Sequence, residues 1–228
     1  MKRRSTLGIA LIGVLLFTAC KREDSMNLDQ QRIYTNYQYT YNSENNTSTM
    51  MATFRLDNSG GTKVELSYPA RVEFNGEGLT WKNGSGRYQL NRSGSQIGGA
   101  FTYRDLDENV YVNDVPHIFG AELPWGITNI SQNGNFFLPW QGEALRTGET
   151  IRVTIGGGDQ TTSRSWTVHT AGSSHIILDQ NGLMDLSVGS AEIQLERESS
   201  GIIQQSTLAG GRISSSYLST KVFINIVN

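Results

Sequence analysis

Hydrophobic and polar residues alternate along most of this chain, and that two-residue period limits the fold more than any other feature of the sequence. An early run places Ile33, Thr35, Tyr37, Tyr39 and Tyr41 on one side of an extended segment. Successive side chains of a β-strand point to opposite faces, so this run predicts a strand with one buried face. No stretch of ten or more residues has a convincing period of about 3.6, which argues against long amphipathic helices.

Short clusters rich in glycine and asparagine separate the alternating runs. They recur at residues 57–61, 75–76, 83–84 and 156–159. Glycine and asparagine tolerate the positive φ angles that tight turns need. Short strands every 8 to 12 residues or so, joined by such turns, are typical of β-sandwiches. The sequence therefore predicts an all-β protein. Two successive series of strands predict two tandem β-sandwich domains, at 32–124 and 125–228, with Pro124-Trp125-Gly126 at the joint.

The first twenty residues have a different pattern. Positive residues at 2–4 precede an apolar run at 7–17, and the small residues at 18–19 lead to Cys20, the only cysteine of the chain. The apolar run is shorter than the roughly 20 residues that a membrane-spanning helix needs. Charge, a short apolar run and small residues in this order predict a cleaved signal peptide over 1–19.

The end of this segment, Phe17-Thr18-Ala19-Cys20, resembles the lipobox of bacterial lipoproteins, with Phe17 in place of the usual leucine. The resemblance implies cleavage before Cys20, diacylation of its thiol and acylation of the new α-amine. Two or three acyl chains hold a protein stably on a membrane, whereas one holds it only reversibly. Residues 20–31 are then expected to form the lipidated N-terminus and a flexible tether.

Two further resemblances concern location and fold. Lys21, rather than aspartate, follows Cys20, and in enteric-type sorting this points to the outer membrane, on its periplasmic or its surface side. Residues 21–24 also look like the surface-export tags of Bacteroidetes lipoproteins. Residues 136–140, 148–153 and 191–197 look like the last strands of Ig-like modules in bacterial surface lipoproteins, which implies an Ig-like sandwich for 125–228 and carries no site residues.

Charge and reactive residues exclude several classes of function. The chain carries 19 basic and 21 acidic residues, so no nucleic-acid partner is predicted. A single cysteine excludes an intramolecular disulfide and a cysteine-rich zinc site. His169 and His175 lack the spacing of a metal motif, and Asp105 and Asp107 lie in a polar loop. We therefore predict no catalytic residue, no metal and no cofactor, although a loop calcium site near Asp105 stays open.

Aromatic residues are the remaining candidates for binding. Trp140 and Trp166 lie in alternating runs and are expected in the core. Trp125 at the joint, together with Trp81 and Tyr34, is a candidate for contact with a ligand. Exposed tryptophan and tyrosine can stack on sugars or anchor a protein partner.

These observations together favour a non-enzymatic, lipid-anchored cell-envelope protein that binds or scaffolds a partner. Its expected contacts are the membrane, through the lipid on Cys20, and a glycan or an envelope protein. One alternative is a carbohydrate-binding lipoprotein of a glycan uptake system. The other is a glycan-active hydrolase, which would need a pair of carboxyl groups in a cleft.

Overall fold

Residues 22–157 and 162–228 are described in the computed structural model of the chain. The predicted signal peptide and Cys20 lie outside these described residues. Strands dominate the regular structure of the described residues and helices are few, so the prediction of an all-β sandwich fold is confirmed. None of their helices is long and apolar enough to cross a membrane.

The largest sheet contains twelve strands within the described residues, and most of them follow the order β1-β4-β3-β2-β19-β18-β15-β16. Strands β7 and β8 join this sheet beside β3, and β12 and β20 join it beside β18. Its strands are β1 (Arg22–Asp24), β2 (Ile33–Asn42), β3 (Thr47–Leu56), β4 (Lys63–Glu65), β7 (Thr80–Lys82), β8 (Arg87–Ser93), β12 (Asn129–Ser131), β15 (Glu149–Gly157), β16 (Ser163–Val168), β18 (Gly189–Gly201), β19 (Gly211–Leu218) and β20 (Val222–Val227).

Smaller sheets pack against this one and complete the sandwiches. One has the order β10-β9-β5-β6, and the other two are the pairs β11–β14 and β13–β17. Their strands are β5 (Arg71–Phe74), β6 (Glu77–Gly78), β9 (Ala100–Arg104), β10 (Val110–Asp114), β11 (Ala121–Glu122), β13 (Phe136–Pro139), β14 (Gln141–Gly142) and β17 (His175–Leu178). The short helices are η1 (Ser25–Asn27), η2 (Gln30–Arg32) and α1 (Gln180–Met184).

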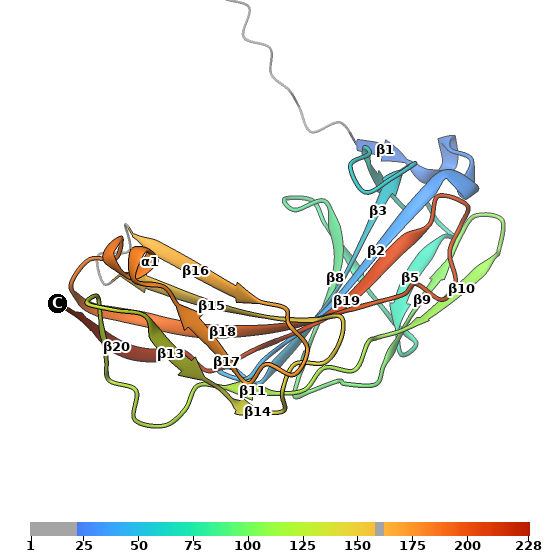
Figure 1. Cartoon of the computed structure of the whole chain (residues 1–228). Coiled ribbons are helices and arrows are strands. Elements are labelled where there is room, and N and C mark those ends of the chain that lie inside the picture. The colour runs from blue at the N-terminus through green and yellow to red at the C-terminus, as the bar shows by residue number, and fades with distance from the viewer. Residues whose placement is uncertain (1–21, 158–161) are drawn as a thin grey trace, which may run out of the picture.

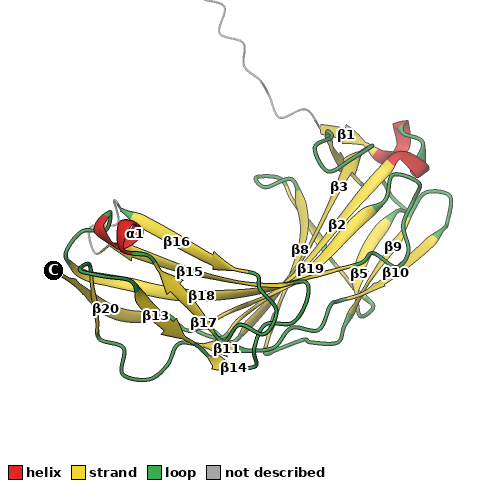
Figure 2. Ribbon diagram, viewed as in Figure 1, coloured by secondary structure: helices red, strands yellow, loops and turns green. Residues whose placement is uncertain are grey.

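The strands are arranged in two lobes that meet at an angle (Figures 1 and 2). The largest sheet runs through both lobes and lies on the inner side of the bend. Strands β5, β9 and β10 cover its other face in the first lobe, and β13 and β17 cover it in the second. The polar face of the largest sheet, turned away from both cores, therefore lines the inside of the bend.

Each lobe has its own core of buried apolar side chains. Alternation in β2 sends Ile33, Tyr37 and Tyr39 into the first core, and alternation in β15 sends residues such as Val153 into the second. The first core draws on residues 33–118 and the second on residues 121–226, with one exception. Ile213 of β19 belongs to the first core. The division into two domains at residue 124 stays a prediction. The C-terminal half also contributes a strand, β19, to the first lobe.

Strand β19 reaches the first lobe by pairing with β2 in parallel, from Gly211 opposite Thr35 to Leu218 opposite Asn42. The segment before it makes further bonds there. The side-chain oxygen of Asn113 accepts hydrogen bonds from the backbone N–H groups of Gln204 and Gln205, at 2.8 and 3.0 Å. The Thr207 hydroxyl donates to the carbonyl of Ile33 at 2.7 Å. Residues far apart in the sequence thus build one lobe.

The prediction of a flexible tether over residues 20–31 is wrong for its described part, residues 22–31. Strand β1 pairs in parallel with β4, with Arg22 opposite Lys63. Ser25 is buried, and its hydroxyl accepts a hydrogen bond from the backbone N–H of Ser67 at 2.8 Å. The amide of Gln30 donates to the carbonyls of Ser25 and Leu28, both at 2.9 Å. Polar residues stay in place here because buried backbone groups satisfy their hydrogen bonds.

A buried ion pair lies in the second lobe, between Arg197 of β18 and Glu149 at the start of β15. Arg197 is fully buried and the side chain of Glu149 is 4% exposed. The guanidinium also donates to the carbonyls of Glu143 and Ala144, at 3.0 and 3.1 Å. The carboxylate accepts a second bond from the backbone N–H of Arg146 at 2.8 Å. The pair therefore fixes the loop that leads into β15.

Candidate functional site

Trp125 is the most exposed aromatic residue among the three candidates, with 92% of its surface accessible. It lies in a tight turn between β11 and β12, where Gly126 has a φ of +84°. Such a left-handed conformation suits glycine and few other residues. The turn holds the indole in solvent. Its role in binding a ligand stays a prediction.

A cavity of about 450 Å³ opens beside this indole. We call it the junction cavity, and its wall combines Leu123, Pro124, Trp125 and Val222 with the more polar Glu122, Gln141 and Thr220. A concave, largely apolar surface with a few polar groups is typical of a site that receives a ligand or a partner's side chain.

Glu122 of β11 fixes the polar edge of the junction cavity. Its carboxylate accepts hydrogen bonds from the Tyr217 hydroxyl at 2.5 Å and from the backbone N–H of Thr220 at 3.2 Å. Burial, and then the bond to this carboxylate, raise the pKa of Tyr217 to about 12. Tyr217 therefore stays protonated at neutral pH and donates to Glu122. The carboxylate is held in place, which keeps the edge of the cavity rigid.

Trp81 of β7 is half-buried and lies in the first lobe. Its ring packs against Tyr88, with 5.0 Å between the centroids, and its Nε1–H donates to the side-chain oxygen of Asn83 at 2.7 Å. The guanidinium carbon of Arg22 lies 5.9 Å from the ring centroid. Much of this tryptophan is thus engaged in contacts within the fold.

Tyr34 of β2 is also half-buried. It lies on the polar face of the largest sheet, turned away from the core. It borders a groove of about 390 Å³ whose basic residues are Arg55, Lys63, Arg87 and Arg212. We call this the basic groove. Lys63 also lines the hollow of about 310 Å³ beside Trp81. Tyr34 and Trp81 therefore border one continuous surface, whereas Trp125 lies apart from them at the junction.

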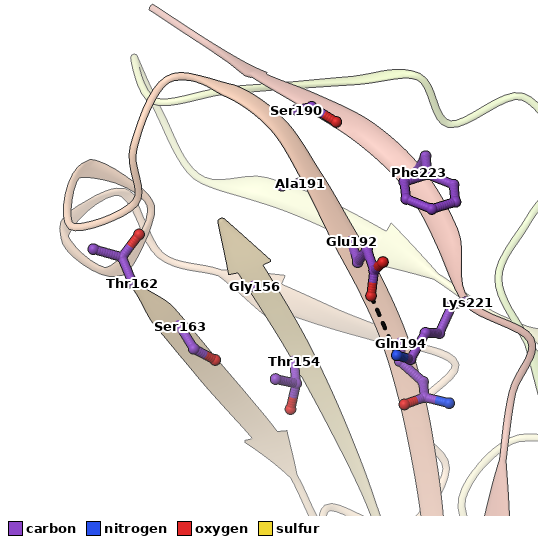
Figure 3. A pocket seen from close by; sticks show the side chains of 10 residues that line it. All are labelled: Thr154, Gly156, Thr162, Ser163, Ser190, Ala191, Glu192, Gln194, Lys221 and Phe223. Atoms are coloured by element: carbon purple, nitrogen blue, oxygen red, sulfur yellow. Dashed lines mark hydrogen bonds and ion pairs between the residues drawn. The ribbon is translucent and has the colours of Figure 1, made fainter. Parts of the chain in front are cut away.

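A second groove lies in the second lobe, on the polar face of the largest sheet that is turned away from the core. Figure 3 shows its side chains. Thr154, Ser163 and Gln194 line it, and Lys221 forms an ion pair with Glu192 at 3.2 Å. Phe223 stands at its rim, 72% exposed. The basic groove and this groove were missed by sequence reasoning, because their residues come from strands that are distant in the sequence.

The carboxylates considered for catalysis do not form a pair. Asp105 is buried, and it accepts hydrogen bonds from the backbone and side-chain N–H groups of Asn109 at 2.9 and 3.0 Å. The Tyr111 hydroxyl donates to it at 3.3 Å, whereas Asp107 is exposed. Asp105 therefore closes the loop between β9 and β10. Among the described residues, no group of three or more histidine, cysteine, aspartate or glutamate side chains could hold a metal ion.

No protein-family model matches the sequence, and no curated protein matches it. Among solved structures, the chain is similar to one from a structural study of host cell surface retention of a 1.5-MDa bacterial ice-binding adhesin. The two are 12% identical, and the match covers 87% of this chain and 67% of that one, with a TM-score of 0.23. A TM-score this low carries no argument about the function of this chain.

Proposed function

We propose that this chain is a lipid-anchored protein of the bacterial cell envelope that binds a partner and catalyses no reaction. Support for the anchor comes from the sequence, where Cys20 follows a short apolar run and two small residues. Lys21 after the cysteine supports the outer membrane, on a side that the sequence leaves open. The bond network that holds Asp105 in a loop supports a role outside catalysis.

The observation that carries the binding function is Trp125, exposed beside the junction cavity. An indole buries roughly 150–250 Å² when a partner covers it, and tryptophan is enriched among the residues that dominate binding energy. The cavity beside it offers space for one apolar side chain of the partner. We propose an envelope protein as the partner, held by Trp125 and by a side chain that enters the junction cavity.

The anchor is tested by metabolic labelling with palmitate in a bacterial host. We expect the unmutated chain to take up label and to fractionate with membranes. The variant Cys20→Ala removes the only thiol that can be acylated, so we expect it to take up no label. An unlabelled parent chain, or a Cys20→Ala chain that takes up as much label as the parent, contradicts the anchor.

The binding site is tested by placing the photoreactive residue benzoylphenylalanine at position 125 in living cells. We expect one cross-linked adduct of defined mass from this position. Position 137 is the control, because Phe137 is also exposed but lies away from the junction cavity. We expect Thr220→Glu, which places a charge on the rim of the junction cavity, to reduce the adduct at least about tenfold. We expect Thr170→Glu, at an exposed position elsewhere, to leave the adduct unchanged. Equal adducts at 125 and 137, or none at 125, contradict the site.

A carbohydrate ligand is the second candidate, and a specific surface favours it. Tyr34 and Trp81 present partly accessible rings beside the basic groove, which also contains the amides of Asn36 and Gln38. Side-chain amides pair with sugar hydroxyls, and aromatic rings stack on sugar rings. The three candidate aromatics do not form one flat row, so any glycan on this surface must be held mainly by polar and charged groups.

A further inference from the structure

Unpaired basic residues are concentrated in the basic groove. The described residues include fifteen lysines and arginines, and nine of these form an ion pair with a carboxylate. Six of the described ones do not, and four of the six are the basic residues of this groove. None of the described residues that line it is acidic. Unbalanced like charges repel each other, so such a cluster lowers stability unless an anion binds there.

The register of the strands brings three of these four residues together, and the fourth, Arg87 of β8, neighbours Tyr88, which lies opposite Ala52 of β3. Arg212 of β19 lies opposite Asn36 of β2, and Asn36 lies opposite Thr53 of β3. Arg55, two residues further along β3, lies opposite Tyr34 on one side and Lys63 on the other. Neighbouring strands are about 4.8 Å apart, and residues two apart on a strand share a face. The basic residues therefore surround a patch only a few strands wide.

Hydrogen bonds to neutral groups hold three of the four basic side chains. Arg212 donates to the side-chain oxygen of Asn36 at 2.8 Å, and Arg55 donates to the carbonyl of Gly61 at 2.8 Å. The Lys63 ammonium donates to the carbonyl of Ser85 at 2.5 Å. These bonds fix the position of each cation and leave its charge uncompensated. Positive charges fixed in advance bind an anion with less loss of side-chain entropy.

Arg87 of β8 is the most unusual member of the cluster. Its Nε is buried and has no hydrogen-bond partner among the described residues. A buried N–H donor without a partner is costly, and charged donors are the costliest. A guanidinium binds phosphate and sulfate through two parallel hydrogen bonds, so an arginine that lines the groove is suited to an oxyanion.

We propose that the basic groove binds a phosphate or sulfate group carried by a glycan. Arg87 and Arg212 hold the anionic oxygens, and Arg55 and Lys63 supply further positive charge. The amides of Asn36 and Gln38 and the rings of Tyr34 and Trp81 contact the sugar next to that group. This inference deepens the carbohydrate alternative of the proposed function, and it is independent of the acyl anchor.

The experiment measures binding of dextran sulfate and of uncharged dextran to the full chain carrying Cys20→Ala. We expect dextran sulfate to bind at low ionic strength, and more weakly as salt rises, because exposed charges are screened. We expect uncharged dextran to bind at least about tenfold more weakly. We expect Arg87→Gln/Arg212→Gln to weaken binding of dextran sulfate at least about tenfold, because two charge-assisted bonds are lost.

The matched control is Arg71→Gln/Arg104→Gln, which removes the same charge from β5 and β9, in a different sheet. We expect this variant to bind dextran sulfate like the parent chain. Thermal unfolding of both double variants checks that they are folded. If Arg87→Gln/Arg212→Gln is unfolded, Arg87→Lys/Arg212→Lys is measured in its place. Equal weakening in the groove and control variants overturns the proposal, because binding then follows net charge alone.

The phosphate group that binds in the groove could instead belong to a lipid headgroup, and binding to vesicles tests this alternative. The full chain carrying Cys20→Ala is mixed with vesicles of phosphatidylcholine alone or with added phosphatidylglycerol. We expect weaker binding to the anionic vesicles than to dextran sulfate at equal charge. Tighter binding to these vesicles that depends on Arg87 and Arg212 overturns the glycan assignment and assigns the groove to lipid headgroups. Palmitate labelling is a separate measurement, so failure of the anchor and failure of this proposal are distinguishable.

Discussion

Replacing Arg197 with methionine is expected to lower the free energy of unfolding by about 3–5 kcal/mol, measured by urea denaturation. The substitution leaves the Glu149 carboxylate buried without its cation, and it removes the Arg197 hydrogen bonds to the carbonyls of Glu143 and Ala144. A buried charge that loses its partner keeps its desolvation cost and loses the attraction that offset it. The loop before β15 is then expected to open.

The control for Arg197→Met is an exposed ion pair of the same chain. Arg164 and Asp185 lie 2.8 Å apart with about half of each side chain accessible, so Arg164→Met is expected to cost less than about 1 kcal/mol. The double variant Arg197→Met/Glu149→Leu removes both charges, and it is expected to regain most of the lost stability. A cost for Arg197→Met as small as that for Arg164→Met contradicts a structural role for the buried pair.

Cutting the chain at the joint is the second large test. A protease site inserted between Trp125 and Gly126 allows the backbone to be cleaved in the folded protein. We expect the two fragments to stay associated on gel filtration. Strands β2 and β19 lie on opposite sides of the cut and pair over eight residues, and Ile213 fills the first core. Asn113 also holds the segment before β19, through its bonds to Gln204 and Gln205.

The same fragments expressed separately give the complementary result. The N-terminal fragment is expected to be unfolded alone, because β2 loses β19, one of its two neighbouring strands, and the first core loses Ile213. Far-UV circular dichroism and protease resistance measure this. Two fragments that elute separately after cleavage, each still folded, contradict a first lobe that depends on β19.

Local features of the fold were accessible from the sequence. The alternation around Tyr37 and Tyr39 predicts the inward face of β2, because a strand's period of two is a local property. Trp140 and Trp166 are buried, as the alternation predicts. These inferences depend only on neighbouring residues.

Long-range features were not accessible in the same way. The parallel pairing of β2 with β19 joins residues at opposite ends of the chain, and strand alternation does not specify a partner. The docking of residues 22–31 depends on bonds to Ser67 and Leu106, so a polar segment looked like a tether. Arg55, Arg87 and Arg212 are outward-facing strand positions, and only the pairing of four strands, β8, β3, β2 and β19, makes them neighbours.

Docking of the N-terminal segment also sets how far the molecule can range from its point of attachment. Arg22 is held in β1 beside Lys63, and a chain spans at most about 3.5 Å per residue. For the anchored protein we propose, two peptide links then separate the acylated Cys20 from the folded body. The folded part of such a protein stays close to the lipid headgroups, because the tether is too short to let it move far from the membrane. A partner must therefore come to the bilayer, or already reside in it.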